Sequence, residues 1–499
     1  MDEPGKPAAS EDRRRARARW AGAVVIGVLS LAVRWPWLTA PGFTNDQRYF
    51  VQWSEITRSP SQWAPPGGLA EVYSPNPARP DRRWCNYPPL YIYILRGLAT
   101  AYDRLAPSGH RLDATLALRV AGGETSDPAR LAYAIFKMPA VLADAALGAL
   151  LFVLLMGRGC GRSAWIVGCV YVLMPAVVHN SALWGQVDAI PTFLMVLSLE
   201  LARRRRVVWM TVVATLALLT KAQAAVLAPA WIIVATGWIA SKNLREVGAA
   251  VKQQARVALN QNRSNDRQET TASRGTAVIR ALTLLTACMA TLLVVLLPFR
   301  GVLDGVWQAY AGAAGYYPFT HLNGFSAWFL ATPLDRPHLD ARALTDWYAL
   351  DSAPGFLGLS PRLWGLLGVG AVWCFVMVRL WRRRCDAGSL SWAARLLPLA
   401  FFTLSTQMHE RYLFPAIALW AWAFAPTRRW WIGWIVLGLC VAINQMWAWP
   451  GPEGMPWAER LGEILHRPWL GVQPGIWCGV AAAGLFVATL IPERDPRPG

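Results

Sequence analysis

The sequence predicts an all-α polytopic integral membrane protein with about twelve transmembrane helices, roughly 11 to 13. Of its 499 residues, 55% are hydrophobic and only 16% are charged, against about 25% charged residues in an ordinary soluble domain. The apolar residues fall in long runs, many near the ~20 residues that cross a hydrocarbon core. Basic residues gather in short clusters at the ends of these runs.

The distribution of the basic residues decides how the net charge of +19 is interpreted. The clusters are RRRARAR at 13–19, GRGCGR at 157–162, RRRR at 203–206, RLWRRR at 379–384 and TRR at 427–429. Short basic loops beside apolar runs are typical of the cytoplasmic side of a membrane protein. A nucleic-acid partner would need the charge on one continuous face, so we predict none.

The first half of the chain begins with a basic cytoplasmic N-terminus at 1–19, which precedes a single transmembrane domain at 20–490. The apolar run at about 20–38 predicts an uncleaved first span, because it is long for a signal peptide and no good A-x-A site follows. A long extracytoplasmic loop at 39–128 and a second span at about 130–156 come next. The turn HNSALWGQVD (179–188) links spans 3 and 4, and TKAQ (220–223) links spans 5 and 6.

The second half begins with a polar stretch at 241–277, which predicts a flexible cytoplasmic linker. Span 7, at about 278–298, leads to a second long extracytoplasmic loop at 299–358. Spans 8 to 12 then turn at RLWRRR, QMHERY, TRR and an outer loop at about 447–471, and a tail at 491–499 is cytoplasmic. In the first loop, CNYPPLYIYIL (85–95) predicts a helix lying in the interface, and its alternative is a thirteenth span.

This topology places unusual polar clusters on the extracytoplasmic side. All six histidines, which are His110, His179, His321, His338, His409 and His466, fall in or beside outer loops. Cysteine spacing suggests neither a disulfide framework nor a metal site, so we predict no cofactor and no metal. Within span 2, Lys137 and Asp144 lie seven residues apart on one helix face, and structural pairing with other helices is the favoured interpretation.

Four segments contain most of the candidate site residues. FTNDQRYFVQW (43–53) contains Asp46, whose alternatives are a solvated loop carboxylate or a helix N-cap. The others supply Trp184, Gln186 and Asp188 from HNSALWGQVD, His321 and Asn323 from YYPFTHLNGF (316–325), and His409, Glu410 and Arg411 from QMHERYLFP (407–415). Each cluster alone could cap a helix or anchor it in the interface. Their convergence on one leaflet predicts a functional site, because ionisable groups at a membrane are costly.

Seven motifs in order along the chain carry a family resemblance. They are FTNDQRYFVQW, NYPPL, FKMPAVLAD (136–144), ALWGQVDA (182–189), LLTKAQAAVLAPA (218–230), YYPFTHLNGFSAWFL (316–330) and QMHERYLFPA (407–416). Over about 30 to 450, the chain resembles the GT-C superfamily of polyprenyl-phosphate-sugar-dependent glycosyltransferases, notably bacterial relatives of the dolichyl-phosphate-glucose-dependent transferases of asparagine-linked glycosylation. Asn86 stands where the eukaryotic relatives carry an acid, and Arg411 replaces their commoner lysine, so the acceptor stays open.

The resemblance implies a GT-C fold and inverting transfer of a hexose, mannose or glucose, from a polyprenyl-phosphate donor. The acceptor would be a glycolipid, a polysaccharide or a protein on the extracytoplasmic side. Asp46 would be the general base, and His409, Arg411 and Lys221 would bind the donor phosphate. Tyr87, Trp184, Gln186, Asp188, His321, Asn323 and Glu410 would line the sugar or acceptor pocket. The transfer is expected to be independent of metal.

Two other functions stay open. A secondary transporter would also have twelve spans with both termini inside, but its halves should repeat, and 20–240 shows no similarity to 278–490. A scaffold without activity would tolerate replacement of Asp46. The preference for Arg over Lys, with abundant Ala, Gly and Trp, suggests a bacterium with a GC-rich genome, and therefore a bacterial inner membrane.

Overall fold

The computed structural model describes residues 7–58, 68–74, 85–241, 265–312, 315, 317–334 and 347–491. Most of these residues are helical, and the strands among them form one short pair. The chain is therefore an all-α protein, as predicted. Most of the predicted linker at 241–277, His338 and the tail beyond 491 lie outside the described residues. The helix α12 nevertheless begins at Asn265, inside the predicted linker, where Arg, Gln, Glu and Ala favour a helix.

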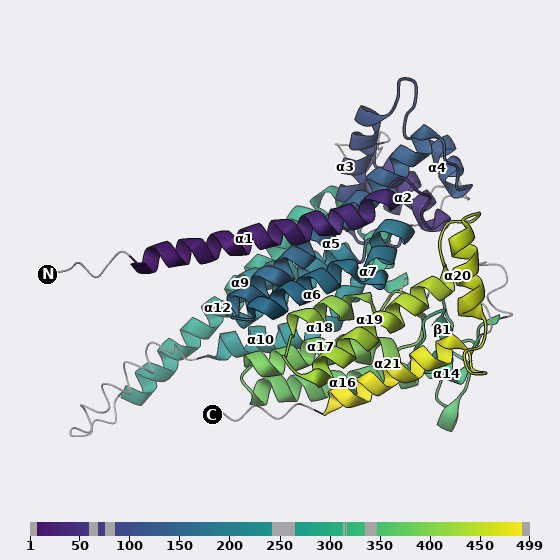
Figure 1. Cartoon of the computed structure of the whole chain (residues 1–499). Coiled ribbons are helices and arrows are strands. Elements are labelled where there is room, and N and C mark those ends of the chain that lie inside the picture. The colour runs from purple at the N-terminus through teal and green to yellow at the C-terminus, as the bar shows by residue number, and fades with distance from the viewer. Residues whose placement is uncertain are drawn as a thin grey trace.

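Helices of different lengths lie side by side and form the body of the molecule (Figure 1). They are α1 (Pro7–Arg34), α5 (Asp127–Gly157), α6 (Gly161–Leu173), α8 (Ala189–Arg203), α9 (Val207–Thr220), α10 (Ala228–Ala240), α12 (Asn265–Leu296), α16 (Pro361–Arg382), α17 (Ala387–Leu404), α18 (Phe414–Trp422), α19 (Arg428–Ala448) and α21 (Pro474–Leu490). Each predicted span overlaps one of these helices. The helix α1 begins and α21 ends at the same end of the bundle (Figure 1).

Seven helical segments among the described residues are long and apolar enough to cross a membrane. The number rises to eight if α6 and the segment Pro175–Trp184, which is bent from it by 48°, form one broken span. These helices support the prediction of a membrane protein. The seven or eight candidate spans do not reach the predicted twelve. The reason is length: α8, α9, α18 and α21 have 15, 14, 9 and 17 residues, fewer than the ~20 of a full span.

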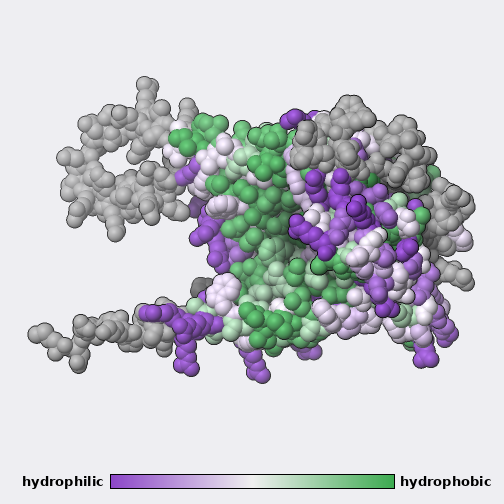
Figure 2. All heavy atoms as spheres, turned by 90° about the horizontal axis from the view of Figure 1, so that it is seen from above, coloured by the Kyte–Doolittle hydropathy of each residue, from purple (hydrophilic) through white to green (hydrophobic). Residues whose placement is uncertain are grey.

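The outer surface of the bundle is apolar, as expected for helices that face lipid. Val24 of α1, Val294 of α12 and Leu366 of α16 are among the large hydrophobic side chains that are exposed. Figure 2 shows hydrophobic side chains in a band across the middle of the visible face, with hydrophilic side chains toward both ends. A soluble protein would bury such a patch.

A second layer covers the end of the bundle opposite to the start of α1 (Figure 1). Its larger helices are α2 (Thr44–Ile56), α3 (Pro89–Leu105), α4 (Ala114–Ala121), α13 (Leu303–Ala311) and α20 (Pro456–His466). The helix α3 buries Tyr91, Leu95 and Tyr102. It is not among the candidate spans, which argues against a thirteenth crossing at 85–95.

Short elements complete the fold. They are η1 (Trp35–Trp37), η2 (Ala70–Tyr73), α7 (Pro175–Val178), η3 (His179–Trp184), η4 (Ala222–Leu227), η5 (Leu297–Val302), β1 (His321–Leu322), α14 (Ala327–Ala331), η7 (Phe356–Gly358) and β2 (Met408–His409). The strands β1 and β2 are parallel, with His321 opposite Met408 and Leu322 opposite His409. This pairing joins the loop after α13 to the segment between α17 and α18.

The charged residues of span 2 tie α5 to its neighbours. Asp144 is fully buried and pairs with Arg34 of α1 at 3.3 Å, and the Arg34 guanidinium also donates to Ser181 Oγ and to the Val172 carbonyl oxygen. The Lys137 ammonium group donates to the carbonyl oxygens of Trp37 and Ala40. Lys137 and Asp144 thus have the structural partners on other segments that the sequence interpretation favoured.

Removal of one partner of the Arg34–Asp144 pair should destabilise the bundle, because the remaining charge is buried without compensation. We expect Asp144→Leu to lower the free energy of unfolding by ~3–5 kcal/mol and to lower the thermal unfolding temperature, measured by intrinsic fluorescence in detergent. The double variant Arg34→Met/Asp144→Leu should recover part of this loss. Equal unfolding temperatures for the single and double variants would show that the pair does not stabilise the bundle.

Candidate functional site

Three breaks in helical structure meet beside the start of α2 at the covered end of the bundle, and they lie at Gly185–Asp188, Lys221 and 405–413. The π-helical turn η3 ends at Trp184 and is followed by Gly185, whose φ of 83° is left-handed and favours glycine. A Cβ atom at Gly185 would overlap the Gln47 side chain of α2. The Phe43 amide donates to the Trp184 carbonyl oxygen at 3.0 Å, so the start of α2 is held against η3. These contacts bring Asp46 to Trp184 and Gln186.

The Asp46 carboxylate is held through one of its two oxygens. Asp46 Oδ2 accepts hydrogen bonds from Trp184 Nε1 at 2.8 Å and from Gln186 Nε2 at 2.5 Å. Gln186 Oε1 in turn accepts from the Tyr87 hydroxyl at 3.0 Å. Asp46 lies in the first turn of α2, whose N-cap is Phe43, and its side chain is half-buried. These contacts exclude the N-cap and the solvated-loop alternatives for Asp46.

The second acid, Asp188, is fully buried between two cations. Lys221 forms an ion pair with Asp188 Oδ1, while Asp188 Oδ2 accepts from Asn180 Nδ2 at 3.1 Å and lies 4.0 Å from Arg411 Nε. Lys221 reaches this position because α9 ends at Thr220 and the Lys221 backbone is extended. Buried charges are stable when they are paired in this way.

The HER motif, which is His409, Glu410 and Arg411, supplies the third acid and the second cation, and the residues around it at 405–413 form the HER segment. Glu410 Oε1 accepts from Arg411 Nη1, and Glu410 Oε2 lies 3.7 Å from His409 Nδ1. Burial disfavours the Glu410 carboxylate, but Arg411 and His409 outweigh this effect and hold the pKa of Glu410 at about 2. Burial lowers the pKa of His409 despite the nearby Glu410. At neutral pH Glu410 is therefore an anion and His409 is neutral.

Aromatic rings pack beside the two cations, Arg411 and Lys221. The Arg411 guanidinium lies 5.6 Å from the Trp184 ring centroid, and Lys221 Nζ lies 5.8 Å from the Tyr87 ring and 5.9 Å from the Tyr412 ring. Such contacts stabilise a cation in a partly dry site. Burial lowers the pKa of Lys221, against the opposing effect of Asp188. The cluster thus contains three acids and two cations, each cation paired with a carboxylate.

The structure places most of the predicted site residues in this one network. They are Asp46, Tyr87, Trp184, Gln186, Asp188, Lys221, His409, Glu410 and Arg411. The network also contains Asn180 and Tyr412, which were not among the predicted residues. Their signal in the sequence was their position inside or directly beside the HNSALWGQVD and HER motifs. The side-chain amide of Gln223 donates to the Tyr412 carbonyl oxygen at 2.5 Å, and this bond joins the TKAQ segment to the HER segment.

The side chains of His321 and Asn323 make their contacts elsewhere. His321 Nε2 bonds to the Thr332 carbonyl oxygen at 2.9 Å, and burial lowers the pKa of His321 to about 4. Asn323 Oδ1 accepts from the Tyr348 hydroxyl at 2.5 Å. The backbone of Asn323 forms a bridge with His409. The backbone of these two residues pairs with the HER segment and supports it. No contact described above joins their side chains to Asp46.

Asp351 supports the same segment and was not predicted from the sequence. Its buried carboxylate binds the Arg362 guanidinium through both oxygens, at 2.9 and 3.0 Å, and accepts from Thr406 Oγ1 and Gln407 Nε2 at 2.9 and 2.7 Å. Gln407 has a φ of 64°, which is uncommon outside glycine. Asp351 therefore fixes a strained turn just before His409. No local pattern reveals this role, because its contacts with Thr406 and Gln407 span more than fifty residues.

Within the described ranges, no group of three His, Cys, Asp or Glu side chains is arranged to hold a metal ion. The predicted independence from metal stays a prediction. In comparisons with known proteins, no family model matches this sequence, and no curated protein matches it. The resemblance to the GT-C superfamily is therefore carried by the motifs alone.

The pKa of Glu410 gives a test of the network. A carboxyl whose pKa falls from 4.5 to about 2 on folding stabilises the folded state above pH 4.5 and loses this contribution as the pH falls toward 2. The shift corresponds to ~3 kcal/mol. We expect Glu410→Gln to flatten the fall of the thermal unfolding temperature between pH 5 and 3.

The matched control is Glu463→Gln, because the Glu463 side chain is 65% exposed and its ion pair is with exposed Arg467. This variant should keep the pH dependence of the unmodified protein. An unchanged profile in Glu410→Gln would mean that the Glu410 carboxylate is not held by Arg411 and His409.

Proposed function

We propose that this protein is a membrane glycosyltransferase of the GT-C type. It transfers a hexose from a polyprenyl-phosphate donor to an acceptor hydroxyl on the extracytoplasmic side. The observation that carries the proposal is the buried cluster in which the Asp46 carboxylate is held beside the Lys221 and Arg411 cations. A carboxylate to take a proton and cations to receive a phosphate are the groups that such a displacement needs.

Asp46 has the geometry of a general base. Both of its hydrogen bonds fall on Oδ2, and Oδ1 accepts none from the described residues. In the proposed step the acceptor oxygen attacks the anomeric carbon and its proton passes to Asp46 Oδ1. The bond from the anomeric carbon to the phosphate oxygen breaks, and polyprenyl phosphate departs with the electron pair. A single displacement of this kind inverts the anomeric configuration.

Arg411 has donor capacity left for the departing phosphate. Its Nη1 is bonded to Glu410, while its Nε is buried without a hydrogen-bond partner among the described residues. Arg411 and Lys221 both approach Asp188, so an added phosphate would lie between two cations that Asp188 already orients. Charge-assisted bonds from such a pair are stronger than neutral ones.

The arrangement of the two ends supports an extracytoplasmic site. The predicted inner loops contact one another: Arg158 donates to the Trp422 carbonyl oxygen and pairs with Glu200, and Arg205 donates to the Arg384 carbonyl oxygen. They lie at the end where α1 begins and α21 ends (Figure 1). Under the positive-inside rule, the cluster at the other end faces outward across a bacterial inner membrane, with twelve crossings and both termini inside.

The secondary transporter is the second candidate, and the buried Arg34–Asp144 pair is the observation that favours it. Ionisable groups within spans often mark a transport path. Here both side chains are fully buried, and they make further hydrogen bonds with Tyr171, with Ser181 and with the carbonyl oxygens of Ser30 and Val172. This arrangement fits a structural tie between helices better than a substrate site.

Replacement of Asp46 tests the proposed base. We expect Asp46→Asn to lower the rate of transfer from a radiolabelled polyprenyl-phosphate hexose by roughly 10²- to 10⁴-fold, because an amide does not accept the proton. Asp304→Asn is the control, since Asp304 is an exposed acid of the covered end. Full activity in Asp46→Asn would remove Asp46 as the base. Absence of transfer by the unmodified protein from every hexose donor and acceptor class tested would overturn the function.

Replacement of Arg411 tests the phosphate site separately from the base. We expect Arg411→Ala to weaken binding of polyprenyl phosphate by roughly 10- to 100-fold, because one charge-assisted hydrogen bond contributes ~1.5–3 kcal/mol. Binding is measured by titration of the purified protein in nanodiscs. Arg467→Ala should leave it unchanged, since Arg467 is exposed on the same side. Undiminished binding by Arg411→Ala would exclude the phosphate role.

A further inference from the structure

A second site lies at the opposite end of the bundle from the acidic and basic cluster. A cavity of about 500 Å³ opens between α17, α18, α19 and α21. It is lined by Trp392 and Arg395 in the first half of α17, by the first two turns of α19, by Trp420 near the end of α18 and by the C-terminal end of α21. Since the HER segment follows α17 and precedes α18, the cavity is separated from it by the length of these helices. It belongs to the end where the basic loops meet.

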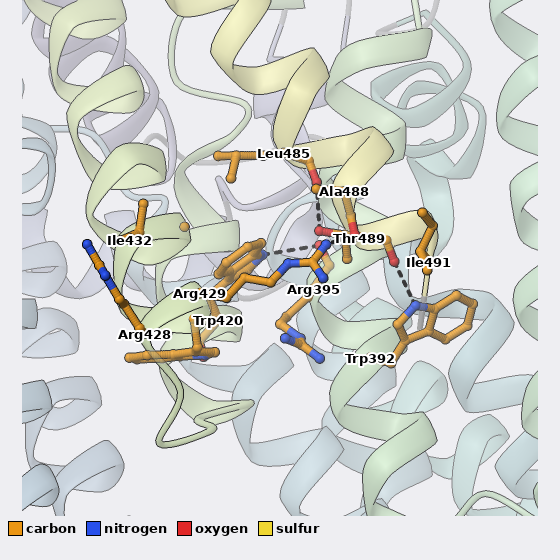
Figure 3. Close-up of a pocket in the computed structure, with 12 residues that line it drawn as sticks. Trp392, Arg395, Trp420, Arg428, Arg429, Ile432, Leu485, Ala488, Thr489 and Ile491 are labelled. Carbon is orange, nitrogen blue, oxygen red and sulfur yellow. Dashed lines mark hydrogen bonds between the residues drawn. The ribbon is translucent and has the colours of Figure 1, made fainter. Parts of the chain in front are cut away.

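The cavity combines positive charge with apolar walls (Figure 3). Its lining contains Arg395, Arg428 and Arg429 and, among the residues that the structure describes, no acidic residue. Arg395 is largely buried and its guanidinium lies 5.9 Å from the Trp420 ring centroid. Arg428 and Arg429 are exposed at the mouth. Cations at a helix N-terminus oppose the helix dipole, so the dipole of α19 does not account for this pair. Arg429 Nη2 donates to the Ala488 carbonyl oxygen of α21 at 2.8 Å, which holds its guanidinium beside the cavity.

The aromatic side chains present carbon surface to the cavity. The indole N–H groups of Trp392, Trp420 and Trp430 already donate to the carbonyl oxygens of Thr489, Arg395 and Trp420. Their rings therefore need no polar partner from a ligand. Leu485 and Ile491 of the α21 end add further apolar surface. A free phosphate ion would leave this surface uncovered, whereas a lipid would cover it with an acyl chain.

We propose that this cavity binds one anionic phospholipid of the inner leaflet. The phosphate group lies at Arg428 and Arg429, with Arg395 below it, and an acyl chain lies against Trp420, Leu485 and Ile491. Basic pockets between transmembrane helices on the cytoplasmic side bind anionic headgroups in this manner. The bound lipid joins α17, α19 and α21 at the end where α19 begins. The proposal does not depend on the proposed glycosyltransferase activity.

The test is native mass spectrometry of the full chain in detergent, titrated with phosphatidylglycerol or with phosphatidylcholine of identical acyl chains. We expect one phosphatidylglycerol to bind at least about tenfold more tightly than phosphatidylcholine, since each arginine near the headgroup contributes ~1 kcal/mol. Arg428→Ala/Arg429→Ala should weaken phosphatidylglycerol binding about 30-fold. Glycerol phosphate, which has the headgroup charge without the chains, should not bind.

Two further variants separate the cavity from diffuse charge. Arg162→Ala/Arg206→Ala removes two exposed arginines of the same end that do not line the cavity, and it should bind phosphatidylglycerol as the unmodified protein does. Ala488→Trp fills the cavity and keeps all three arginines, and it should also weaken binding. An equal loss in the control pair, full binding by Ala488→Trp, or equal affinity for the two lipids would each overturn the proposal.

Discussion

The structure depends on one constraint, which is that backbone groups in lipid must find hydrogen-bond partners within the protein. Long helices meet this demand in the body of the molecule. Non-helical backbone is tolerated only where protein buries it, and here it is concentrated at Gly185–Asp188, Lys221 and 405–413. These three breaks meet around Asp188. The same interruptions that are costly in lipid therefore bring the candidate site residues together from distant parts of the chain.

Burial of charge determines how these residues are arranged. Asp188 and Glu410 are almost completely buried, and each carries a cation as its partner. Asp46 is held instead by two neutral donors, Trp184 and Gln186. Neutral donors fix the position of a carboxylate without supplying a full opposing charge. Among the described residues Asp46 is thus the acid of the cluster that forms no direct ion pair, and this difference is why we propose it as the base.

The two ends of the bundle differ in chemistry. One end holds the mixed cluster of acids and cations under a layer of short helices, and the other gathers arginines around an apolar cavity. A membrane gives these ends different surroundings, because anionic lipids are concentrated in the cytoplasmic leaflet. In the orientation that we propose, the arginines that would orient the chain would therefore also bind the lipid that surrounds it. Orientation and lipid contact would then have a common electrostatic origin.

The sequence determined the class of protein and the positions of its helices. Transfer of a side chain into lipid has a free energy that is nearly local to each residue, so runs of apolar letters reveal helices such as α5 and α19 without knowledge of the fold. The basic clusters likewise identified the loops that meet at one end. Motifs with unusual polar residues also predicted Asp46, Asp188 and Arg411 as candidate site residues.

Only the tertiary structure decided which polar groups are partners. Asp46 is 138 residues from Trp184, and Lys221 is 33 residues from Asp188, so no periodic pattern encodes either contact. Likewise, only the structure shows that the His321 side chain bonds to Thr332 and that Asp351 supports the HER segment. It also shows that α8, α9 and α18 are shorter than full spans. Pairing depends on distances between segments that are remote along the chain. Such distances arise from the packing of whole helices, which no single segment determines.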